Sequence, residues 1–83
     1  MTKREITVRL DGGLETRPVA LLVQMASQFQ SEVYVESENR RVNAKSIMGM
    51  MSLVLIPGTK VTVDAEGDDE EKAVQSIEAF LTK

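Results

Sequence analysis

Apolar residues recur at two different spacings along this chain, and the order of the two patterns is what most constrains its fold. Alternation every second residue predicts strands, and recurrence every third or fourth residue predicts helices with one buried stripe. The strand pattern occurs at Ile6, Val8 and Leu10, over 32–37 and 40–43, and at Val61, Val63 and Ala65. The helical pattern occurs over 16–28, 47–53 and 69–82. The predicted order is therefore βαββαβα.

Turn and capping residues separate these segments. Pro18 suits the first turn of a helix, where its missing N–H is not needed. Glu38-Asn39 is a candidate tight turn because asparagine tolerates positive φ. Asp68 or Asp69 is expected to cap the last helix, and Asp68 with Glu71 has the spacing of a capping box.

The alternating strands predict a sheet with one buried and one exposed face. We therefore expect an α+β fold, an open-faced β-sandwich in which three helices cover one face of a four-stranded antiparallel sheet. The 83 residues are expected to form a single domain, 1–83.

The composition argues against several classes of function. Histidine and cysteine are absent, which removes disulfides and the usual ligands of transition metals, so no metal or other cofactor is expected. Ten basic and thirteen acidic residues give a net charge of −3, which argues against direct nucleic-acid binding. No apolar run is long enough to span a membrane. Without cysteine or an export signal, a cytoplasmic location is expected.

Two segments carry functional information, and the first is Gly12-Gly13-Leu14-Glu15-Thr16-Arg17-Pro18. Glycine allows close backbone approach, and the helix that follows directs free N–H groups at the loop, so this place tolerates anions. It lacks the pattern of a nucleotide-binding loop. The alternative remains that Gly-Gly only turns the chain and that Arg17 is an ordinary surface residue.

The second segment is Asn43 to Leu53, which contains a short predicted helix capped by Ser46. At about 100° per residue, its apolar side chains fall in two separate arcs. Since a small domain cannot bury a helix all round, we assign Met50 and Leu53 to the core. The exposed arc is then formed by Ile47, Met48 and Met51. A Met-rich surface suits partner binding, although burial of all five residues is the open alternative.

Both segments resemble the HPr family of small phosphotransfer proteins, and the likeness extends over the whole chain. Gly13 to Pro18 is similar to the active-site pattern Gly-x-His-Ala-Arg-Pro, with Glu15 at the histidine position and Thr16 in place of alanine. Ser46-Ile47-Met48-Gly49 is similar to the segment around the family's regulatory serine. The combination resembles a regulatory branch of the family that lacks the histidine and keeps the serine.

The resemblance implies a role in carbon catabolite repression rather than enzymatic activity. It implies that HPr kinase/phosphorylase phosphorylates Ser46, and that the product binds catabolite control protein A, a LacI-type regulator, as a corepressor. Arg17, Ile47, Met48 and Met51 are the expected partner-binding residues.

Two other functions remain open at this point. A phosphocarrier of the phosphotransferase system with a divergent active site would use Glu15, and an interaction module with an HPr-like fold would bind another partner. A homodimer is also compatible with the sequence, because the first strand of so small a sheet can exchange between subunits.

Overall fold

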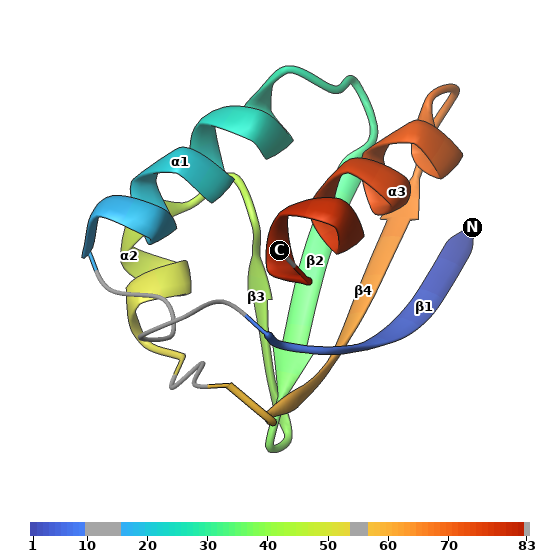
Figure 1. Ribbon diagram of the computed structural model, residues 1–83. Helices are drawn as coiled ribbons and strands as arrows, with labels where there is room; N and C mark the ends of the chain where they lie inside the picture. The colour runs from blue at the N-terminus through green and yellow to red at the C-terminus, as the bar shows by residue number, and fades with distance from the viewer. Residues whose placement is uncertain (10–15, 54–56, 83) are drawn as a thin grey trace.

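The seven expected elements are present in the expected order. The computed structural model describes residues 1–9, 16–53 and 57–82, and Figure 1 shows the arrangement. The elements are β1 (Thr2–Thr7), α1 (Thr16–Ser27), β2 (Glu32–Ser37), β3 (Arg40–Asn43), α2 (Ile47–Met51), β4 (Lys60–Glu66) and α3 (Glu70–Leu81). The four strands form one sheet in the order β1-β4-β2-β3, and all neighbours are antiparallel. The predicted fold class is confirmed.

The buried face of the sheet carries the apolar residues that alternate along each strand. Val35 of β2 lies opposite Val63 of β4, and Ile6 of β1 lies opposite Val61. The turn between β2 and β3 uses Glu38 and Asn39, both with positive φ (52° and 67°), as the sequence indicated. This turn fixes the register of β3 against β2.

The helices cover the buried face of the sheet. Figure 1 shows α3 in front of the strands, and α1 contacts both α2 and α3. Val19, Leu22 and Ala26 of α1 are buried, so the predicted stripe of this helix is confirmed. The stripe of α3 is buried as well and consists of Ala73, Val74, Ile77, Phe80 and Leu81. In the part of the chain that the structure describes, no helix combines the length and the apolar character that a membrane crossing requires.

Two elements end at least two residues before their expected ends. β1 ends at Thr7, but Val8 remains fully buried and its backbone pairs with Thr59 and Gly58 at 2.8 Å each. The strand pattern therefore continues past the regular ladder, and Leu10 lies outside the described residues. α2 ends at Met51 rather than near Leu53, because the last turn tightens and Ser52 N–H bonds the carbonyls of Gly49 and Met50.

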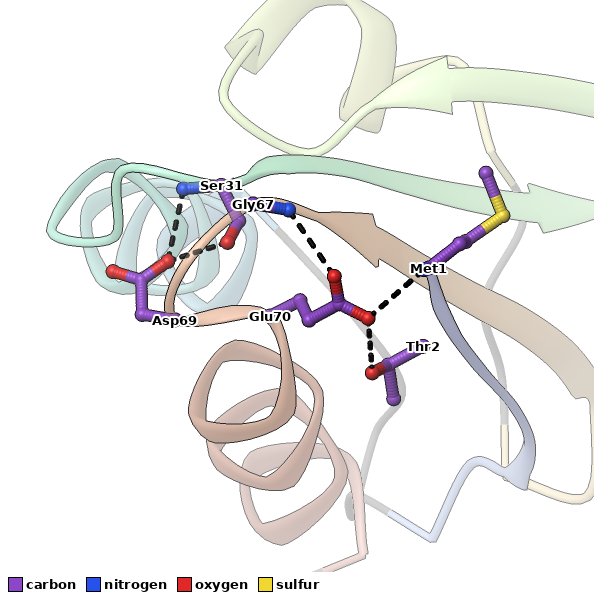
Figure 2. Close-up of polar contacts among 6 residues, drawn as sticks. All are labelled: Met1, Thr2, Ser31, Gly67, Asp69 and Glu70. Carbon is purple, nitrogen blue, oxygen red and sulfur yellow. Dashed lines mark hydrogen bonds and ion pairs between the residues drawn. The ribbon is translucent and has the colours of Figure 1, made fainter.

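The predicted capping box at the start of α3 is wrong, because the N-cap is Asp69 and its side chain makes no capping bond. Its carboxylate instead accepts hydrogen bonds from the hydroxyl and N–H of Ser31 (Figure 2). It also accepts the N–H of Gln30. Ser31 itself is completely buried. Asp69 thus joins α3 to the chain entering β2.

Glu70, the next residue, joins α3 to the beginning of β1. Its carboxylate accepts a 2.6 Å hydrogen bond from the Thr2 hydroxyl and lies 3.1 Å from the N-terminal amine (Figure 2). It also accepts a hydrogen bond from the N–H of Gly67 at 3.3 Å. Gly67 has φ 153°, and a Cβ there would lie 2.6 Å from Ser31 Oγ, so only glycine fits this junction.

The free energy of unfolding should decrease in acid as the carboxylates of Asp69 and Glu70 become protonated. The Ser31 hydroxyl lowers the pKa of Asp69 below its ordinary value of 3.8, and the Thr2 hydroxyl lowers the pKa of Glu70 below 4.5. Because the folded-state values are the lower ones, the stabilisation is complete above the ordinary values and is lost as pH falls through the folded-state pKa values. Melting temperatures measured between neutral pH and pH 2 should show this loss.

Asp69→Asn and Glu70→Gln should each flatten this pH dependence, because the variants have no proton to bind there. Glu71→Gln is the matched control, since Glu71 lies in the same helical turn and its side chain is exposed. Equal slopes for the wild type and all three variants would contradict the assignment.

Candidate functional site

The chain leaving β3 is held firmly as it approaches Ser46. The Asn43 side-chain oxygen accepts the N–H of Lys45 at 2.8 Å, and the Asn43 carbonyl accepts the N–H of Ser46 at 3.0 Å. Ala44 is fully buried and bonds the Val33 carbonyl. The Lys45 ammonium donates to the Phe29 carbonyl at 2.8 Å, so this cation is bound to the segment between α1 and β2. These contacts set the position of Ser46 relative to the sheet.

Ser46 is the N-cap of α2, as predicted. It has extended backbone angles (φ −105°, ψ 114°), and its Oγ accepts the N–H of Gly49 at 3.2 Å. Ser46 is exposed to solvent. Its hydroxyl therefore accepts one hydrogen bond and retains its own proton for donation.

The apolar residues of α2 divide between core and surface as the helical angles predicted. Met50 is fully buried and Leu53 is 8% exposed, so these two side chains anchor the segment. Ile47, Met48 and Met51 are 45%, 82% and 53% exposed. We call these three residues the Met patch. Ser46 directly precedes the Met patch, so a hydroxyl and an adaptable apolar surface lie side by side.

Arg17 and Glu15 belong to the other predicted segment. Arg17 lies in the first turn of α1, and Figure 1 shows α2 next to the beginning of that helix. The backbone thus brings position 17 to the neighbourhood of α2. Glu15 lies outside the described residues.

Leu21 is an exposed apolar residue that sequence reasoning missed. It is 48% exposed on α1, one turn after Arg17 and on the helix that contacts α2. A signal for it was available, because Leu21 lies about 160° around the helix from the buried Val19. A large apolar side chain opposite the buried stripe is a candidate extension of the partner-binding surface.

The site offers a hydroxyl that can accept a phosphoryl group and, beside it, the apolar surface of the Met patch. A serine hydroxyl can receive a phosphoryl group, and phosphoserine brings about −1.5 to −2 charges at pH 7. In the described parts of the chain, no group of three or more acidic side chains is arranged to hold a metal ion.

The whole-chain comparison identifies the family. Residues 2–83 match the family model described as the HPr component phosphorylation site of the phosphotransferase system. The chain therefore belongs to the HPr family. It contains no histidine, so it cannot form the phosphohistidine that the resemblance associates with this family.

Two characterised relatives are HPr-like proteins named Crh. The chain is 45% identical to Crh of Halalkalibacterium halodurans over 83 residues, which covers 100% of this chain and 99% of the relative. It is 47% identical to Crh of Bacillus subtilis over 81 residues, covering 98% and 95%. These are relatives named as HPr-like proteins, and the resemblance seen in the sequence is confirmed.

Solved structures give the same result for the fold. The phosphocarrier protein HPr of Bacillus anthracis superimposes with a TM-score of 0.93 at 40% identity, covering 96% of this chain and 95% of that one. The crystal structure of Bacillus subtilis Crh superimposes with a TM-score of 0.77 at 47% identity, covering 98% and 93%, and is described as a dimer with a swapped domain.

Proposed function

We propose that this protein is a regulatory HPr-like protein that is switched by phosphorylation of Ser46 and is not an enzyme. The observation that carries the proposal is the exposed residue Ser46 beside the Met patch, in a family member without histidine. The whole chain, 1–83, would act as one domain in the cytoplasm, in carbon catabolite repression.

Phosphorylation would change the charge of the surface without requiring a change of fold. The added negative charge would lie at the start of α2, where the helix dipole favours anions. Ser46 is exposed, so the phosphate oxygens would be available to a partner's Arg or Lys through charge-assisted hydrogen bonds. The phosphate would supply the switch, and the Met patch would supply apolar area.

The proposed partners follow from the family resemblance. HPr kinase/phosphorylase would modify Ser46, and catabolite control protein A, a LacI-type regulator, would bind the phosphorylated form with this protein as corepressor. Arg17 and the Met patch are the proposed contact residues. Leu21 is added to them because it is exposed on the adjoining helix.

The direct test is incubation with HPr kinase and ATP, followed by mass mapping of the modified residue. A single phosphate on Ser46 is expected. A protein that remains unmodified while an ordinary HPr is phosphorylated in the same reaction would favour an interaction module with another partner.

We also propose that two copies of this chain associate by exchanging β1. This strand lies at one edge of the sheet. Thr2 and the N-terminal amine contact Glu70 of α3, and Arg4 forms an ion pair with Glu78 of the same helix. A β1 strand from a second copy would make the same contacts, and the Crh dimer described above supports this arrangement.

Strand exchange has a kinetic signature that simple docking lacks. Releasing β1 requires breaking its six-residue pairing with β4, so monomer and dimer should interconvert slowly. Protein refolded at high concentration should contain more dimer by light scattering than protein refolded when dilute, and the difference should persist after both are brought to one concentration. A monomeric mass in both samples would contradict exchange.

A further inference from the structure

The glycine at position 49 is not explained by the backbone of α2. It lies within this five-residue helix, where glycine loses more conformational entropy on folding than alanine. Among the described glycines, Gly58 and Gly67 have positive φ, whereas Gly49 has helical angles that any residue adopts. The reason for this glycine must therefore lie in what surrounds it.

Space around Gly49 is sufficient for one methyl group. A Cβ built there would lie 3.4 Å from Val42 Cβ and 3.4 Å from Ser46 Oγ, at the short end of ordinary van der Waals contact. Val42 is partly buried against the core, so the methyl group would gain an apolar neighbour. On packing and helix propensity together, alanine should stabilise the domain.

The methyl group would also lie against the Ser46 hydroxyl. That oxygen already accepts the Gly49 N–H at 3.2 Å, so one of its directions is occupied. A phosphoryl donor must approach the Ser46 Oγ from one of the directions that remain unoccupied. A side chain at position 49 would take up part of that space, next to the oxygen that reacts.

We infer that Gly49 is a positioning residue that keeps one side of the Ser46 hydroxyl open for phosphoryl transfer. The inference rests on the function proposed above. In the transfer, Ser46 Oγ forms a bond to the terminal phosphorus of ATP, and the bond from that phosphorus to the leaving ADP breaks. The hydroxyl proton passes to a base of the kinase. The added phosphoryl oxygens then need room beside Oγ, which a methyl group on residue 49 would reduce.

Gly49→Ala should therefore have opposite effects on stability and on modification. Its urea midpoint should be at or above that of the wild type. The kcat/KM for phosphorylation of Ser46 by HPr kinase should fall at least about tenfold, mostly in kcat, because misalignment of reacting groups penalises the chemical step. Gln75→Ala is the control, since Gln75 is exposed on α3 and its replacement favours the helix away from Ser46. Its phosphorylation kinetics should match the wild type.

Each outcome of this experiment decides the inference. A more stable Gly49→Ala protein that is phosphorylated slowly supports it. Equal rates for Gly49→Ala and wild type overturn it, and leave the proposed function intact. A lower urea midpoint for Gly49→Ala also overturns it, because the glycine would then serve the fold. Failure of the wild type itself to be phosphorylated refutes the proposed function, and the inference with it.

Discussion

Ser46→Ala should abolish phosphorylation-dependent binding to the catabolite-control regulator and leave the fold intact. The variant has no hydroxyl to modify, so kinase and ATP should no longer change its affinity. Its folding cost should be limited to the loss of one N-cap bond, about 1 kcal/mol. Titrating the regulator at fixed salt against kinase-treated wild type and variant, with urea unfolding of both, measures the two effects. Equal affinities of phosphorylated and unphosphorylated wild type would remove Ser46 as the switch.

The Met patch supplies the matched variants for this experiment. Met48→Ala and Met51→Ala keep the Ser46 hydroxyl, so they should still be phosphorylated at position 46. Their phosphorylated forms should bind the regulator more weakly, because a buried apolar side chain contributes roughly 1.5–3 kcal/mol to an interface. A surface charge contact alone contributes on the order of 1 kcal/mol. Unchanged affinity after both substitutions would remove the patch from the binding surface.

No phosphoryl relay from the general phosphotransfer enzyme is expected, which is the second large effect. The chain has Glu15 where the family pattern has histidine, and a carboxylate has no ring nitrogen to form a phosphoramidate. Incubation with that enzyme, phosphoenolpyruvate and a sugar permease should give no transfer above background. Transfer at the rate of an ordinary HPr would refute this expectation and favour the divergent phosphocarrier.

Glu15→His tests whether the missing ring nitrogen is the cause. This variant should recover part of the relay, limited by the bulk of Thr16 beside the new imidazole. Glu15→Gln is the control, since it removes the carboxylate charge without supplying a ring nitrogen. Transfer by Glu15→His but not by Glu15→Gln would identify the missing ring nitrogen as the cause, and no transfer by either variant would contradict it.

The elements of this fold could be predicted because their signals are local. Val33 and Val35 are buried and alternate with polar residues, and the buried Met50 is separated by its helical angle from the exposed Met48 of the same short helix. Each of these patterns needs only a few neighbouring residues to be read. The helical period separated the apolar residues of this segment into two arcs, and the small size of the domain indicated that one of the arcs stays exposed.

The contacts at the start of α3 could not be predicted in the same way. Asp69 is of a residue type that is favoured at helix N-caps, but its carboxylate accepts a hydrogen bond from Ser31, 38 residues earlier in the chain. Glu70 bonds Thr2, 68 residues away. A local rule assigns such side chains to their own helix, because nothing nearby in the sequence reveals the tertiary partner. The Asp69 side chain therefore does not cap α3, although Asp69 stands at the N-cap position.

The shortness of α2 has a consequence for how the proposed switch responds to modification. Five residues form few internal hydrogen bonds, and the buried anchors described for the segment are Met50 and Leu53. Such an element can open locally at a free energy well below that of global unfolding, so its amide hydrogens should exchange sooner than those of the β2–β4 ladder. A phosphate or a bound regulator can then stiffen the site while the sheet stays as it is, and ordering of this one turn becomes part of the binding free energy.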